Sequence, residues 1–484
     1  MRSASGAPVF VGVGRDFDVA SYLKGVGHTK LVQVRFPVAL TTQDEKGTAG
    51  PLTAPATLDW WVAKANGAGT QSLTWPIADG PYDLVIMNAD GKTAPDVRVT
   101  LGIEIPKAFT TALTVFALGI VLLAIGILLI LFRRRPNRPI PQPHSTVPPQ
   151  QQPRPTGAPL RRIMVAGLAV SALTGCAAVP QQDTVQSLTR PAVSTEAAAA
   201  AIKRYDEVSN AANKRRDDKL IATVETGDLL RLTQASYTID RVLDKAGKNL
   251  PKPTTHVKPS IGAPTYGGYP MYFVSAAGMS AHKDYKTLDL WERKTAGSPW
   301  LMKHSLYPEN KVKLPGLEGL RPLAAADHGK LAVPPAAAAA ALAEYLNVGA
   351  QSRRAALFEP SEDVTRILGT VSDGKSLVKE DPKSYRAAID TFRVNGTPTA
   401  FLTSSGEALV FLSLTDEFQL QVGAGLSIYW SQGSPGSAYS PPTTKYNGAI
   451  TSTILYQVAL VIPKKGAKLR ILSTSDELVA AGGY

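Results

Sequence analysis

Cysteine is almost absent from this sequence, since Cys176 is the single cysteine among 484 residues. One cysteine excludes an intramolecular disulfide framework and a cysteine-rich zinc site. The six histidines have none of the H-x3-H or H-E-x-x-H spacings that bind zinc, and the G-x-S-x-G motif of serine hydrolases does not occur. We therefore expect no metal, no cofactor and no catalytic residue of these kinds.

Acidic residues are missing from residues 133–162, which contain seven arginines. The chain has a net charge of +13, so this one stretch supplies about half of its excess positive charge. A surface that binds single-stranded nucleic acid has aromatic residues interleaved with its basic residues. The basic residues of this chain lack that pattern, and we therefore expect no nucleic acid as a partner. Nine prolines within residues 136–159 predict an extended linker over residues 133–160.

Charge and proline are both absent from residues 108–132, a run of 25 apolar or small residues. A helix of this length crosses the ~30 Å hydrocarbon layer, so we expect a transmembrane helix within residues 107–132. The arginines that follow it predict that residues 133–162 are cytoplasmic and residues 1–106 extracytoplasmic.

A second membrane signal follows, in which Arg161 and Arg162 precede the apolar run of residues 163–175. Such a plan is typical of a secretory signal. The segment 161–176 resembles a bacterial lipoprotein signal peptide, because it ends in a lipobox formed by Leu173, Thr174, Gly175 and Cys176. The resemblance implies lipid attachment to Cys176, cleavage before it, and export of everything that follows. Residues 177–195 are expected to form a short linker to the exported domains.

The position of this signal in mid-chain leaves two alternatives open. The chain re-enters the membrane after a cytoplasmic loop, or two neighbouring genes are joined in one reading frame. The first residues offer no apolar run for export of residues 7–106. Either the helix at 108–132 translocates its own N-terminal tail, or an upstream signal is missing.

Residues 1–106 have the pattern of a β-sandwich-like domain, with short β-branched runs at 8–13, 31–36, 84–87 and 97–103 separated by turn signals. We expect Trp60, Trp61 and Trp75 to pack in its core and rim rather than to form a carbohydrate platform. The segments 11–14 and 85–91, with Trp61, resemble a small extracytoplasmic module that precedes a single span in membrane proteins of unknown function from high-GC Gram-positive bacteria.

An internal repeat relates residues 199–208 to residues 339–348, because an alanine run, an aliphatic residue, a tyrosine and a valine recur at equal spacing. Each copy is predicted to pass from helices into strands and to close with a hairpin, which is an α+β order. The predicted hairpins have turns at 295–297 and 464–466. The two regions, 196–310 and 336–478, resemble tandem nuclear-transport-factor-like (cystatin-like) domains, which implies cones of curved antiparallel sheet around helices, often with a pocket. We place the domains at 196–310 and 336–484, with a linker at 311–335.

A match to the phosphate-binding pattern G-x-x-x-x-G-K-[ST] is formed by Gly369, Gly374, Lys375 and Ser376. A functional P-loop follows a buried strand and opens a long helix, whereas Pro382 would end a helix here within about six residues. The motif also lies downstream of an export signal. We therefore expect a polar turn at 369–376.

These observations predict a membrane-anchored extracytoplasmic lipoprotein that acts as a non-catalytic ligand-binding or envelope-scaffold module. Its expected partners are membrane lipid and either cell-envelope components or a small apolar ligand. The alternatives are a P-loop nucleotide hydrolase that uses residues 369–376 and a cell-wall enzyme with an unrecognised site.

Overall fold

The computed structural model describes residues 1–132, apart from residues 5, 36–38, 49, 51, 93–94, 101 and 103–107, and residues 188–484. It divides into two units, Met1–Val97 with Gln186–Tyr484, and Arg98–Val185.

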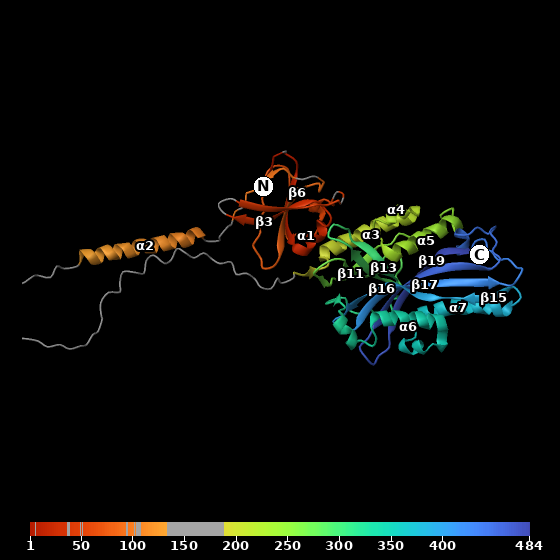
Figure 1. Cartoon of the computed structure of the whole chain (residues 1–484). Helices are drawn as coiled ribbons and strands as arrows, with labels where there is room; N and C mark the ends of the chain where they lie inside the picture. The colour runs from red at the N-terminus through yellow and green to blue at the C-terminus, as the bar shows by residue number, and fades with distance from the viewer. Residues whose placement is uncertain are drawn as a thin grey trace, which may run out of the picture. The chain divides into compact units, whose positions relative to one another are not determined.

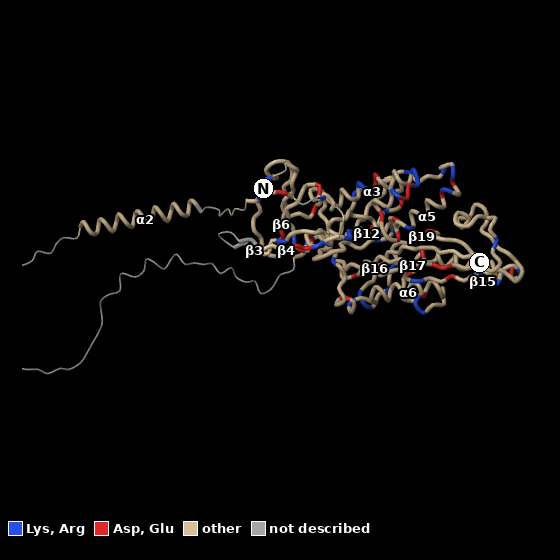
Figure 2. Tube along the Cα trace, turned by 45° about the horizontal axis from the view of Figure 1, so that its top comes forward, with Lys and Arg blue, Asp and Glu red and all other residues tan. Residues whose placement is uncertain are grey.

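The second unit contains α2 (Ala108–Leu131), the helix expected to span the membrane. Its segment Phe109–Leu131 has a mean hydropathy of 3.0, and no part of it is buried against the rest of the protein. It carries no charged residue along its length (Figure 2). Among the described residues this is the one helix long and apolar enough to cross a membrane, as the sequence predicts.

The N-terminal region is rich in strands but differs from the expected sandwich. Its central sheet is antiparallel with the order β5-β2-β6, and β3 and β4 form a separate hairpin. A short helix that was not expected, α1 (Asp16–Tyr22), packs against the central sheet. The strands are β1 (Arg2–Ser3), β2 (Val9–Arg15), β3 (His28–Arg35), β4 (Ala39–Glu45), β5 (Ala63–Gly67), β6 (Tyr82–Asn88) and β7 (Val97–Arg98), with a 3-10 turn at Pro55–Thr57.

Two of the three tryptophans form the core of this region. Trp60 and Trp61 are buried with their rings 4.0 Å apart, while Trp75 packs against Tyr82 at the rim. A Cβ atom on Gly14 of β2 would lie 2.7 Å from the Trp60 ring, so glycine is required for the tryptophans to lie flat on this strand. Core packing of Trp60 and Trp61 is thus confirmed.

Residues 190–306, the first half of the C-terminal region, place helices before an antiparallel sheet of order β13-β12-β11-β9. Ser194 caps the first helix by accepting the Ala197 N–H. The elements are β8 (Arg190–Pro191), α3 (Thr195–Arg215), α4 (Asp218–Ile221), α5 (Gly227–Leu243), β9 (His256–Gly262), β10 (Thr265–Tyr266), β11 (Met271–Met279), β12 (Lys286–Arg293) and β13 (Leu301–Leu306).

Residues 321–483, the second half, repeat this order with a six-stranded sheet in which β14-β16-β17-β18-β19 form a path and β15 pairs with β17. The elements are β14 (Arg321–Pro322), α6 (Pro335–Val348), α7 (Glu362–Glu380), β15 (Tyr385–Ile389), β16 (Phe392–Leu402), β17 (Ala408–Val422), β18 (Ala449–Ile462) and β19 (Arg470–Gly483). Short 3-10 turns lie at Ala325–Lys330, Gly349–Gln351, Arg353–Leu357 and Pro435–Ala438. Both alanine-rich repeat segments are helical, and both predicted hairpins form.

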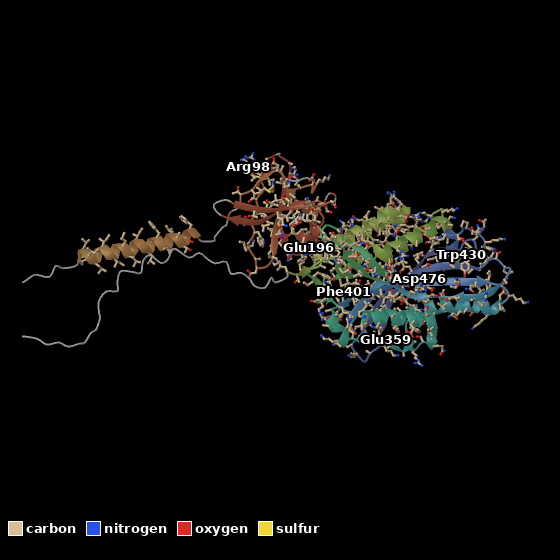
Figure 3. All side chains as sticks on the ribbon, in the orientation of Figure 1. Arg98, Glu196, Glu359, Phe401, Trp430 and Asp476 are labelled. Atoms are coloured by element: carbon tan, nitrogen blue, oxygen red, sulfur yellow. The ribbon has the colours of Figure 1, made fainter. Side chains whose placement is uncertain are left out.

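The two halves pack sheet against sheet. Side chains alternate along each strand, so β12 directs Trp291 towards α3 and directs Leu288 and Leu290 towards β17 of the second half. Phe401 and Phe411 of the second sheet complete this central core (Figure 3). Figure 1 shows the resulting layers, with α3 and α5 on one side of the sheets and α6 and α7 on the other.

Residues 311–335, expected to be a linker, and the described part of the linker expected at 177–195 contribute to the core instead, whereas the linker expected at 133–160 lies outside the described residues. Leu317 and Leu320 are buried between the two sheets, and β14 extends the second sheet. Near residue 190, Arg190 is buried and β8 pairs with β10. Each of these two segments contains a few apolar residues among polar ones. The segments become part of the core because those apolar side chains are buried. Within the expected strand at 97–103, β7 covers Val97–Arg98 and the next two residues are outside any strand, while residues 101 and 103 lie outside the described residues.

Candidate functional site

The four lipobox residues, Leu173, Thr174, Gly175 and Cys176, lie outside the described residues, as does the basic loop 133–160. Lipid attachment at Cys176 therefore stays a prediction.

The P-loop-like residues Gly369, Gly374, Lys375 and Ser376 lie inside α7, which runs without interruption from Glu362 to Glu380. The expected polar turn is wrong, because the helix begins at a Ser361 cap and buries Val364, Ile367 and Val371 at helical spacing. A phosphate cradle requires an open loop with free backbone N–H groups, which a helix interior does not offer. Gly374 lies on α7 beside Phe418, where an added Cβ would make an ordinary van der Waals contact at 3.4 Å. The helix ends before Pro382, as expected.

A buried histidine joins two carboxylates between α3 and the first sheet. His256 Nδ1 lies 2.6 Å from Asp206 Oδ1, and its Nε2 lies 3.2 Å from Asp289 Oδ2. The His256 backbone N–H also donates to Asp206 Oδ2. Ser275 and Ser305 donate their hydroxyls to Asp289 rather than to the imidazole. We call His256, Asp206 and Asp289 the acid–histidine cluster.

The acid–histidine cluster keeps its imidazole protonated. Burial lowers the pKa of His256, but the hydrogen bonds and charges of Asp206 and Asp289 outweigh it and raise the pKa to about 10. A general base near neutral pH needs a pKa near 7, so this histidine is unsuited to that role. The imidazolium instead bridges two buried carboxyl groups and joins α3 to the sheet.

A second buried acid lies on the same side of the first sheet. Glu225 is 3% exposed and accepts a hydrogen bond of 2.9 Å from the Tyr205 hydroxyl. Burial raises the pKa of Glu225 to about 7 despite this bond. The Tyr205 ring packs edge-on against Trp291, with centroids 5.7 Å apart, so the pair lies within the helix-to-sheet core.

The second half contains a pair of carboxyl groups, Asp390 and Asp416, that hydrogen bond to each other. Asp416 lies on β17 and accepts the Thr391 N–H at 3.0 Å. Burial and the adjacent Asp390 raise the pKa of Asp416 to about 7. The Lys375 charge acts on Asp390 from α7 and opposes the effect of burial there.

An open hollow of about 470 Å³ lies at the far end of the second sheet, over β15, β17, β18 and β19. Its lining is mainly hydroxyl, amide and backbone groups, with Glu417 as its charged side chain and Phe418 as its aromatic one. By strand alternation, Asp416 and Phe418 lie on one face of β17 and Glu417 and Gln419 on the other, so the hollow at this end of the sheet is lined by residues of both faces.

The N-terminal region contacts the C-terminal region through a buried ion pair. Asp18 of α1 is fully buried and pairs with Arg190, whose Nε and Nη2 lie 3.0–3.1 Å from its carboxylate oxygens. Tyr269 donates its hydroxyl to Asp18 at 2.7 Å and accepts from Arg190 at 2.8 Å. A charge-assisted, multidentate contact of this kind is among the strongest polar interactions in proteins.

The turn of the β12–β13 hairpin enters the tryptophan core of the N-terminal region. The carbonyl of Ala296 accepts from Trp60 Nε1 at 3.0 Å, and its N–H donates to the Ser21 hydroxyl at 3.0 Å. Thr53 donates to the Gly297 carbonyl. Beside the turn, Arg293 donates to Asp59 at 2.6 Å. Together with the Asp18–Arg190–Tyr269 contact, these bonds form what we call the docking interface.

Sequence reasoning missed both the acid–histidine cluster and the docking interface. His256 is 50 residues from Asp206 and 33 from Asp289, so no local motif marks the cluster. Asp18 and Arg190 are 172 residues apart. Among the described residues, no three His, Cys, Asp or Glu side chains are placed to hold a metal ion.

Comparison with known families provides one finding. A family model described as "Domain of unknown function (DUF8094)" matches residues 189–483. The chain belongs to this family. The DUF8094 region spans both halves and begins one residue before Arg190, so the arginine of the docking interface lies inside it and Asp18 lies outside it. No curated protein and no solved structure matches the chain.

Proposed function

We propose that the chain is a membrane-anchored extracytoplasmic lipoprotein whose DUF8094 region acts as a non-catalytic scaffold or ligand-binding module of the bacterial cell envelope. The apolar helix α2 supports a membrane location. The lipobox at Leu173–Cys176 supports a second anchor, which would be a lipid on Cys176.

The observation that carries the proposal is the docking interface. Asp18 precedes α2 in the chain and Arg190 follows the signal-like segment 161–176, yet the two side chains form a buried ion pair. Two protein surfaces can pack in this way only on the same side of a membrane. If α2 were the one segment to enter the membrane, the two surfaces would lie on opposite sides. A second export event between residues 132 and 188 resolves this conflict, and the segment 161–176 has the composition for it.

The excess of arginine in residues 133–162 supports a specific orientation. Arginine-rich loops are retained in the cytoplasm, so residues 1–97 and the DUF8094 region would both be extracytoplasmic. The scarcity of cysteine agrees with exposure to an oxidising compartment.

Two features favour a scaffold or binding role over catalysis. The histidine of the acid–histidine cluster is held protonated between two carboxyl groups, and the P-loop-like residues lie in a helix. The order of helices and antiparallel strands in each half supports a tandem nuclear-transport-factor-like architecture, with the hollow over β17–β19 as the surface for a ligand.

Cysteine accessibility in intact cells tests the arrangement. We choose Ile77, which is 83% exposed, the partly exposed Ser434 in the DUF8094 region, and Gln150 in the basic loop, and replace each singly by cysteine. A membrane-impermeant maleimide should label the variants at 77 and 434 and should label the variant at 150 only after lysis. The unmodified chain, whose Cys176 thiol is expected to carry lipid, is the control. Labelling at 150 in intact cells, or protection at either 77 or 434, would contradict the proposal.

A further inference from the structure

The docking interface has a consequence for the processed protein, which rests on the proposed function because it assumes cleavage before Cys176. We infer that the mature protein is a complex of two chains, an N-terminal subunit that contains α2 and ends at Gly175 and a lipoprotein that begins at Cys176, held together by the docking interface.

The position of the cut supports this inference. Every contact of the docking interface joins a residue in 1–97 to a residue in 190–297, and none involves residues 98–187. Residues 98–185 also form a structural unit of their own. Cleavage between residues 175 and 176 therefore leaves the interface intact.

The chemistry of the interface is that of a stable association. The Arg190 and Asp18 side chains are 8% and 0% exposed, so each depends on the other for charge compensation. Removal of one partner would leave an uncompensated buried charge. Tyr269 bridges both groups, and tyrosine and arginine are typical of the residues that dominate binding energy at interfaces.

Apolar residues also join the two regions across the docking interface. Ala296 is fully buried within the tryptophan core of the N-terminal region, and Phe17 packs into the core formed by α3, β11 and β12. Each fragment thus places a residue in the hydrophobic core of the other. Separation would expose Trp60 and leave its indole N–H without the Ala296 carbonyl.

Co-purification of the fragments from the full-length protein tests the inference. The chain, tagged at both ends, is expressed in a high-GC Gram-positive host, solubilised in mild detergent and captured through its C-terminal tag. Denaturing electrophoresis should then show two fragments, with the N-terminal one recovered at about equal amount. If the chain is cleaved but the N-terminal fragment remains in the unbound fraction, the inference of a two-chain complex is overturned and the proposed function is not. A single uncleaved chain would overturn the lipoprotein assignment of the proposed function, and with it the premise of the inference.

Variants on both sides of the docking interface test whether it holds the two chains together. Asp18→Ala should weaken the association on the order of a hundred-fold or more, because it leaves Arg190 unpaired. Tyr269→Phe removes one hydrogen bond to Asp18 and should weaken the association of the two fragments by roughly ten-fold or less. The matched control is Asp44→Ala, since Asp44 is exposed and bonds to Thr29 within its own hairpin. Equal recovery from Asp18→Ala and Asp44→Ala would contradict the inference.

Discussion

The acid–histidine cluster makes the stability of the DUF8094 region depend on pH in a defined direction. The pKa of His256 rises from its usual value near 6.5 to about 10 in the folded protein. A raised pKa means that the folded state binds this proton more tightly than the unfolded chain does. The resulting stabilisation is fully present below about pH 6.5 and is lost as the pH rises towards 10.

The size of this effect follows from the two pKa values. Each pKa unit corresponds to 1.36 kcal/mol, so a rise from pH 6.5 to 9.5 removes at most ~4 kcal/mol from the free energy of unfolding. Because the unfolded chain is half protonated at pH 6.5 and the folded protein is only partly protonated at pH 9.5, we expect a loss of about 3 kcal/mol. For a domain of this size that corresponds to a decrease in melting temperature on the order of 5 °C.

The substitution His256→Gln removes the titrating group but keeps an amide donor at the same place. We expect lower stability at pH 6.5, by about 3 kcal/mol, because two buried carboxylates lose their cation. We also expect the decline between pH 6.5 and 9.5 to disappear. His282→Gln is the control, since His282 is exposed. Thermal melts of the detergent-solubilised protein across this range measure both effects. Parallel curves for wild type and His256→Gln would refute the assignment of the proton to this ring.

Two further substitutions separate the roles of residues in the second half. Asp416→Asn should make stability less dependent on pH between 4 and 7, because the raised pKa of Asp416 implies that the folded state loses stability as the pH rises through this window. Thermal melts against the exposed control Glu380→Gln would show this, and an unchanged slope would contradict it. Lys375→Ala should change the free energy of unfolding by no more than about 0.5 kcal/mol, and millimolar Mg-ATP should not raise the melting temperature of the wild type, because Lys375 is exposed on α7. A rise of ~2.7 kcal/mol with ATP, abolished by Lys375→Ala, would restore the nucleotide site.

Local periodicity accounts for much of what the sequence predicts. The apolar run of α2, the alanine-rich helices α3 and α6 and both predicted hairpins depend on residues close together in the chain. The alternation of β12 marks Leu288 and Leu290 as one face and Trp291 as the other.

The remaining features depend on contacts between distant residues. The segment 311–320 has the composition of a linker, and it is ordered because Leu317 and Leu320 fill the space between two sheets. Residues 369–376 contain two glycines and several polar residues, which favour a turn, but the buried stripe along α7 outweighs that local preference. The partners of His256 and Asp18 are determined by how strands and helices from separate parts of the chain pack together. No short sequence motif indicates such long-range contacts.

The measurement that tests the account most directly is the mass of the C-terminal product from cells grown with labelled palmitate. The account predicts a labelled fragment that begins at Cys176, partitions into detergent and is lost in Cys176→Ala. An unlabelled chain with a mass unchanged by Cys176→Ala would contradict it, because the DUF8094 region would then lack the lipid anchor that defines a lipoprotein.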